Sequence, residues 1–236
     1  MNFASAFTAE GIQKAWECLL NEFPFAIWET LYSTVLATLF AIVIGLPLGV
    51  ILVTGEQKGI RPLPSPLMKF LNVLINLLRS VPFIILMVLV IPLTRAIVGT
   101  SVGTVASIVP LTVAAFPFIA RLVESSLREI NPNIIEAAQS MGATPWQIVV
   151  KVMLPESVPS LITNFTLAIT TIMGYTAMSG AVGGGGLGKL ALDYGYRRYM
   201  PSILILAVIV LVVITQIMQS FGTWLARKSD RRLKEK

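Results

Sequence analysis

Five apolar stretches, each long enough to cross a lipid bilayer as a helix, constrain this chain of 236 residues more than any other feature. A helix needs about 20 apolar residues to span a hydrocarbon core of about 30 Å, and none of the stretches alternates with the period of two typical of a strand. Hydrophobic residues make up 55% of the chain and charged residues 13%, which is too apolar for a soluble domain of this size. The sequence therefore predicts an all-α, polytopic membrane protein with five transmembrane helices, over residues 31–53, 67–93, 96–120, 158–182 and 202–225.

The chain has no histidine and a single cysteine, Cys18. It therefore lacks the side chains for a histidine-based metal site, for Ser-His-Asp or Cys-His catalysis and for an internal disulfide. No carboxylate pair or activated nucleophile stands out, so we predict no catalytic residue, no metal site and no cofactor in this chain. The net charge of +6 is more typical of membrane topology signals than of nucleic-acid binding.

The distribution of Lys and Arg predicts how the spans are oriented. Basic residues in the first loop, the third loop and the tail outnumber those at the N-terminus and in the second and fourth loops. The positive-inside rule then gives an extracytoplasmic N-terminus and a cytoplasmic C-terminus. The chain divides into an interfacial lead-in over residues 1–30, a transmembrane domain over residues 31–225 and a basic cytoplasmic tail over residues 226–236.

Prolines and glycines within the spans indicate helices that pack on other helices. Gly45 and Gly49, and likewise Gly99 and Gly103, are four residues apart, a spacing that lets two helices approach closely. A proline within a helix leaves a backbone carbonyl without its partner, and a neighbouring helix must then bond that carbonyl. Prolines occur within or near the spans at Pro47, Pro82, Pro92, Pro110 and Pro117.

Arg79 is the one charge well inside an apolar run. An arginine in mid-membrane costs about 3 kcal/mol on insertion scales, so it needs a partner such as Glu124 or a carbonyl freed by a proline. Alternatively, the second span begins near Arg79 and residues 67–78 form a separate interfacial helix. The sequence leaves both interpretations open.

The fourth span contains a polar stripe at helical spacing. Such a stripe either forms hydrogen bonds between helices or lines a path for a polar solute, and the candidate path residues are Ser160, Thr163, Asn164, Thr171, Tyr175 and Ser179. No span has the interior carboxylate pair expected of an ion-coupled pump, which indicates that the energy for any transport comes from elsewhere.

Gly183, Gly188 and Lys189 match the start of a phosphate-binding loop, but we reject that interpretation. The motif requires Ser or Thr after the lysine, where this chain has Leu190, and it requires a preceding strand. We expect the glycine run to end the fourth span and lead into a surface segment. In that segment Asp193, Arg197 and Arg198 are candidates for contact with an extracytoplasmic partner.

The loop over residues about 121–157 contains a short predicted helix with a face of small residues. Asn131, followed by Pro132, is a suitable start, and Gly142 with Pro145 is a suitable end, which leaves about two turns. Such a helix suits insertion into a groove on another protein. A sixth span over residues 134–154 is the alternative, but Glu136, Gln139, Gln147 and Lys151 disfavour insertion there.

These motifs resemble those of a known family. Glu136-Ala137-Ala138, with Gly142 four residues later and Leu154-Pro155 beyond, resembles the EAA loop of bacterial ABC importer permeases. Residues 79–82, Arg-Ser-Val-Pro, resemble an element of the amino-acid permeases in that family. Residues 174–188 and 194–196 are similar to those of its methionine-uptake members.

The resemblance implies a type I importer subunit of five spans in the bacterial inner membrane. Two copies would form the path, two separate ATPase subunits holding ATP and Mg would bind on the cytoplasmic side, and an extracytoplasmic binding protein would deliver the solute. Methionine and its derivatives are the implied solutes; another amino acid or small organic solute, or an ion-coupled carrier or channel, is the alternative. The residues implied to couple to the ATPase are Glu136, Ala137, Ala138, Gly142 and Pro155.

Overall fold

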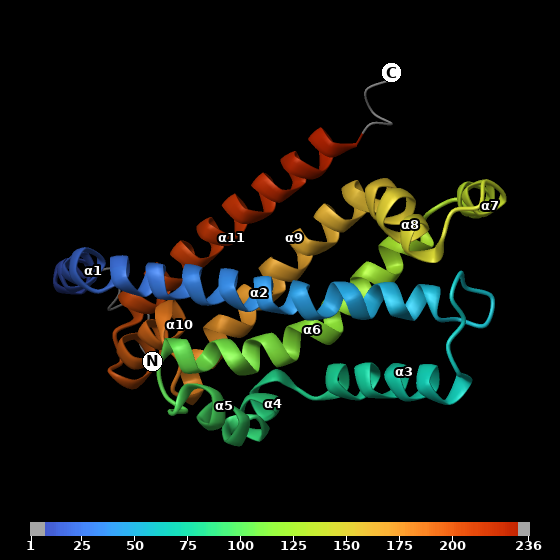
Figure 1. Ribbon diagram of the computed structural model, residues 1–236. Coiled ribbons are helices and arrows are strands. Elements are labelled where there is room, and N and C mark those ends of the chain that lie inside the picture. The colour runs from blue at the N-terminus through green and yellow to red at the C-terminus, as the bar shows by residue number, and fades with distance from the viewer. Residues whose placement is uncertain (1–7, 231–236) are drawn as a thin grey trace. The chain divides into compact units, whose positions relative to one another are not determined.

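The computed structural model describes residues 8–230, and every regular element within that range is a helix (Figure 1). Four helices contain segments long and apolar enough to span a membrane: α2 (Phe23–Thr54), α6 (Thr104–Arg128), α9 (Leu154–Ser179) and α11 (Pro201–Ser229). Shorter helices are α1 (Ala9–Asn21), α3 (Ser65–Ser80), α4 (Phe83–Leu89), α5 (Ile91–Val98), α7 (Pro132–Ser140), α8 (Pro145–Ile148) and α10 (Gly186–Leu190). The predicted all-α, polytopic membrane fold is confirmed, with α1 inside the predicted lead-in. Residues 1–7 of that lead-in and 231–236 of the predicted tail lie outside the described residues.

The predicted second span, residues 67–93, is not one straight helix. Helix α3 ends at Ser80, α4 begins at Phe83, and the two axes differ by 109°, so they make a fifth span only if the bent pair is counted as one. The cause is local, because Val81 is extended (φ −80°, ψ 126°), as a residue before proline prefers, and Pro82 has no N–H to continue the helix.

Arg79 therefore lies in the last turn of α3, next to the break, and it is exposed. Its predicted partner Glu124 is paired instead with Arg121 and Arg128. This agrees with the second of the two interpretations, in which the segment before Arg79 is a separate helix.

The two predicted glycine pairs behave differently. A Cβ on Gly45 would lie 2.8 Å from the carbonyl oxygen of Phe116, and one on Gly49 would lie 2.6 Å from that of Ala120, so these glycines let α2 approach α6 closely. Gly99 and Gly103 have positive φ angles of 81° and 103°, and no described atom lies within 4 Å of a Cβ there. The prediction of helix packing is wrong for this second pair, which forms the turn between α5 and α6. The predicted third span, residues 96–120, is divided by the same turn.

The chain forms two compact units, and each of the four long helices contributes to both. The first comprises Met1–Leu39, Pro82–Val113 and Ile169–Met218, with a core that includes Phe23, Leu187, Ile203 and Ala207. The second comprises Phe40–Val81, Ala114–Ala168 and Gln219–Lys236, and its core joins α2, α3 and α6 through Leu52, Met68, Ile75 and Ala120.

Cys18 lies in the core of the first unit and is 8% exposed. Burial, with a smaller contribution from the charge of Glu22, raises the pKa of the Cys18 thiol. Because the thiolate is the reactive form, this cysteine has a structural environment rather than a reactive one.

Candidate functional site

Helix α7 begins and ends where its sequence predicts. The side chain of Asn131 accepts a hydrogen bond from the backbone N–H of Asn133 at 3.0 Å, and Pro132 occupies the first helical position. Beyond Ser140 the chain turns through Gly142, whose φ of 78° is the left-handed conformation that glycine adopts most readily. Because α7 stops here, the alternative of a single helix over residues 134–154 is wrong.

The two sides of α7 have different surroundings. Ala138 is the buried residue of α7, with 4% of its surface exposed, and α7 contacts the π-helical turn Val149–Met153. Glu136 and Ala137 are exposed, and so are Gly142 and Pro155. Two large apolar side chains nearby are also exposed, Met141 at 81% and Trp146 at 74%. Helix α7 and the turn and helix that follow it therefore expose small, acidic and apolar side chains.

The segment after α7 leads through α8 into α9, the third of the four long helices. Thr144 and Gln147 form a reciprocal capping box at the start of α8, with Pro145 at the first helical position. Helix α8, the π-helical turn, α9 and a 3-10 turn over Gly180–Val182 then form one apolar helical stretch over Pro145–Val182. The helical stretch thus starts well before residue 158, where the sequence suggested the fourth span to begin.

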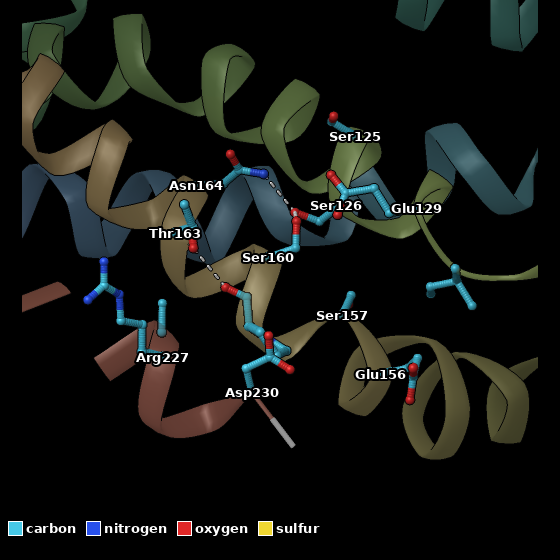
Figure 2. A pocket seen from close by; sticks show the side chains of 13 residues that line it. Ser125, Ser126, Glu129, Glu156, Ser157, Ser160, Thr163, Asn164, Arg227 and Asp230 are labelled. Atoms are coloured by element: carbon cyan, nitrogen blue, oxygen red, sulfur yellow. Dashed lines mark hydrogen bonds between the residues drawn. The ribbon is translucent and has the colours of Figure 1, made fainter. Parts of the chain in front are cut away.

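A pocket of about 460 Å³ lies in the second unit (Figure 2). Three of the six predicted path residues, Ser160, Thr163 and Asn164, line it. The other lining residues are Ser125, Ser126, Glu129, Ile130, Glu156, Ser157, Pro159, Ala226, Arg227 and Asp230. Serine and threonine hydroxyls, one amide, three carboxylates and one guanidinium thus surround the same space.

The hydrogen bonds in the pocket fit both interpretations of the polar stripe. Asn164 Nδ2 donates to Ser126 Oγ at 2.8 Å and to the Leu122 carbonyl at 3.3 Å, and Ser160 donates to Ser126 at 3.2 Å. These bonds join α9 to α6. Thr163 donates within its own helix, to the Pro159 carbonyl at 3.0 Å, and remains exposed.

The other three predicted path residues belong to the first unit and do not line this pocket. The Tyr175 ring stacks on Phe83 with centroids 4.8 Å apart, and Thr171 is partly exposed. Ser179 is fully buried and donates to the Thr176 carbonyl at 2.7 Å, so it has no open face for a solute.

The glycine run binds a carboxylate from its own chain. Glu29 accepts hydrogen bonds from the Gly186 N–H at 2.8 Å and the Thr104 hydroxyl at 2.5 Å, and Thr30 accepts one from the Leu187 N–H at 2.9 Å. Two backbone N–H groups of the run, those of Gly186 and Leu187, are therefore already occupied, which agrees with rejection of the phosphate-loop interpretation. Sequence reasoning missed Glu29, whose partners are distant in the chain.

The predicted extracytoplasmic contact residues lie in and next to the π-helical segment Ala191–Arg197. Arg197 pairs with Asp193 at 2.6 Å, and the Arg198 guanidinium lies 4.4 Å from the centroid of the Tyr194 ring. Both arginines are exposed.

Among the described residues, no group of His, Cys, Asp or Glu side chains has the arrangement of a metal site.

Sequence reasoning also missed a charged network in the second unit. Glu124 on α6 pairs with Arg121 at 2.6 Å and with Arg128 at 2.8 Å, and Arg128 pairs with Glu56 at 2.5 Å. Arg121 also donates to the side-chain oxygens of Asn72 at 2.8 Å and Asn76 at 2.9 Å, both on α3. The i, i+3 and i, i+4 spacings on α6 were visible in the sequence, but the partners on other elements were not.

These features define a class of protein: a helical membrane protein whose long helices are interrupted by a short, exposed helix suited to docking. Residues 41–235 match the family described as "Binding-protein-dependent transport system inner membrane component", and the chain belongs to this family.

Individual relatives support this assignment. The chain is 49% identical over 207 residues to a Vibrio cholerae protein named probable D-methionine transport system permease protein MetI, covering 88% of this chain and 92% of the relative. A protein of the same name from Pasteurella multocida is 51% identical over 205 residues, covering 86% and 94%.

Solved structures are similar as well. One described as inward-facing conformations of the MetNI methionine ABC transporter, CY5 native crystal form, has a TM-score of 0.88 at 45% identity and covers 91% of this chain and 99% of that chain. An amino acid ABC transporter with histidines shares the fold, with a TM-score of 0.76 at 16% identity, covering 94% and 100%.

Proposed function

We propose that this chain is the membrane-spanning permease subunit of an ATP-driven ABC importer for methionine, including its L- and D-forms and derivatives. Relatives near 50% identity and the MetNI transporter structure support the solute and the class of transporter. The observation that carries the proposal is α7, an exposed short helix that is followed, after a turn over residues 141–144, by the apolar helical stretch that contains α9.

Helix α7 is the contact with the ATPase in this proposal. Ala137 is exposed, and its small side chain lets α7 fit closely into a groove on a partner. Ala138 is buried on the side of α7 that packs within this chain. Glu136 supplies a charge, Gly142 permits the return turn, and Pro155 lies in the first turn of α9. Met141 and Trp146 add exposed apolar anchors of the kind that dominate protein interfaces.

Energy then comes from partner chains. ATP with Mg binds two separate ATPase subunits, and this chain performs no hydrolysis. Closure of the ATPase pair displaces α7 in each of two permease copies, and rigid-body motion of the spans switches the path between its two open states. A binding protein on the other face delivers the solute, with Asp193, Arg197 and Arg198 as its candidate contacts.

The pocket lined by Ser160, Thr163 and Asn164 is the proposed path of this subunit within the second unit. A zwitterionic amino acid has an ammonium group that suits Glu129 and a carboxylate that suits Arg227. Hydroxyl and amide groups offer further hydrogen bonds that a moving solute exchanges for those of water.

The location proposed is the bacterial inner membrane, with the N-terminus outside and the C-terminus in the cytoplasm. Taken together, the first loop, the third loop and the tail contain more Lys and Arg than the N-terminus and the second and fourth loops, which supports this orientation.

Affinity purification of a tagged copy tests this proposal. We expect an ATPase subunit to co-purify with it, and excess unlabelled L- or D-methionine to suppress uptake of labelled methionine by cells. Co-purification of the ATPase from cells also tests the orientation, because an ATPase reaches α7 only from the cytoplasm. Isolation of the chain as a stable bundle without an ATPase would contradict the proposal.

A further inference from the structure

The charged network on α6 joins three separate elements of the second unit. Glu124 lies at its centre, with its side chain 12% exposed between Arg121 and Arg128. From this centre one arm reaches Glu56, just after α2, and the other reaches α3. Asn72 and Asn76 are one turn apart on α3, so a single guanidinium bonds both amide oxygens.

The network lies directly beside the docking helix in the chain. Arg128 is the last residue of α6, and Asn131, which caps α7, follows only three positions later. Leu127 and Ile130, on either side of this link, are 2% and 6% exposed, so the link is held against the unit. Because the connection is short and buried on both sides, we expect a displacement of α7 to move Arg128 as well.

The geometry of these bonds opposes sliding between α6 and α3. Guanidinium bonds to carboxylate and amide oxygens are directional and need fixed positions of both partners. A shift of one helical turn, about 5.4 Å, would break both bonds of Arg121 to α3 at once. The apolar contacts around Met68 and Ile75 alone would tolerate smaller slips more gradually.

We propose that Arg121, with Glu124 and Arg128, transmits the displacement of α7 to α3 through Asn72 and Asn76, so that α3 moves together with the docking helix. This inference rests on the proposed function as an ATP-driven importer. These side chains are positioning residues: they touch neither ATP nor solute, and they keep α3 in register with α6 while Glu56 holds the end of α2 to the same bridge.

The double variant Asn72→Leu with Asn76→Leu tests the bridge. It removes both oxygens that accept from Arg121 and leaves every ion pair of the network in place. In vesicles that contain the permease with its ATPase, we expect the solute imported per ATP hydrolysed to fall about fivefold or more, as for a loss of coupling between sites. Assembly with the ATPase and the thermal midpoint of the complex should stay close to those of the unaltered protein.

The matched control is Asn72→Asp, which keeps an acceptor oxygen for Arg121 and is expected to retain the unaltered ratio of import to hydrolysis. An unaltered ratio in the double leucine variant would overturn the inference. So would an equal loss of ATPase assembly and import, because that outcome indicates a merely structural role. Absence of ATP-driven import by the unaltered complex would instead overturn the proposed function, and this inference with it.

Discussion

Ala137→Trp is expected to prevent docking of the ATPase while the permease still folds and inserts. Ala137 is exposed on α7, so an indole there meets no part of its own chain that must move. In a groove that fits a small-residue face, the same indole has no space. Loss of a contact at the centre of such an interface costs about 2 kcal/mol or more, which corresponds to roughly 30-fold weaker binding.

The measurement is the amount of ATPase retained on the tagged permease, together with ATP-driven uptake. Ala137→Ser is the matched control, since it keeps the side chain small and is expected to retain both. If the tryptophan variant retained its ATPase and its uptake, α7 would not be the docking element.

Gly188→Ala is expected to disrupt the first unit. Gly188 lies in α10, and a Cβ there would overlap the backbone carbonyl of Ala177 in α9. Gly180, just after α9, likewise lies against the backbone of Gly188 and Lys189 in α10. The two segments therefore meet backbone to backbone, with no flexible side chain that could move aside for an added Cβ. Overpacking of this kind costs about 1–3 kcal/mol and sometimes more. We expect a clearly lowered thermal midpoint in detergent and a loss of uptake.

Gly174→Ala is its control in the same unit. Gly174 lies within α9, is exposed, and has no described atom within 4 Å of a Cβ. Alanine favours a helix by about 1 kcal/mol over glycine, so this variant should be as stable as the unaltered protein or more so. Equal thermal midpoints for the two variants would contradict the tight crossing of α9 and α10.

Features set by neighbouring residues could be predicted from the sequence. The start of α7 depends on Asn131 and Pro132, and its end depends on Gly142, all within one short segment. The long apolar helices follow from composition and length, because lipid leaves the backbone few alternatives. The spacing of Gly45 and Gly49 also predicted a close helix approach, which the structure has between α2 and α6.

Features that depend on residues far apart in the chain could not be predicted from the sequence. Glu29 bonds Gly186, 157 positions away, and Arg128 bonds Glu56, 72 positions away, so nothing local identifies either carboxylate. Spacing also did not distinguish Gly99 and Gly103, which turn the chain, from a packing pair. The polar stripe on α9 was visible, but helical period alone could not show that Ser179 is sealed within the fold while Thr163 lines a pocket.

Uptake of labelled methionine by proteoliposomes tests the central claim most directly. The vesicles would contain this permease and its ATPase, with the binding protein and solute on one side and ATP with Mg on the other. We predict accumulation that requires ATP, stops when the ATPase is left out and is suppressed by unlabelled methionine. Accumulation at the same rate without the ATPase or without ATP would contradict the account.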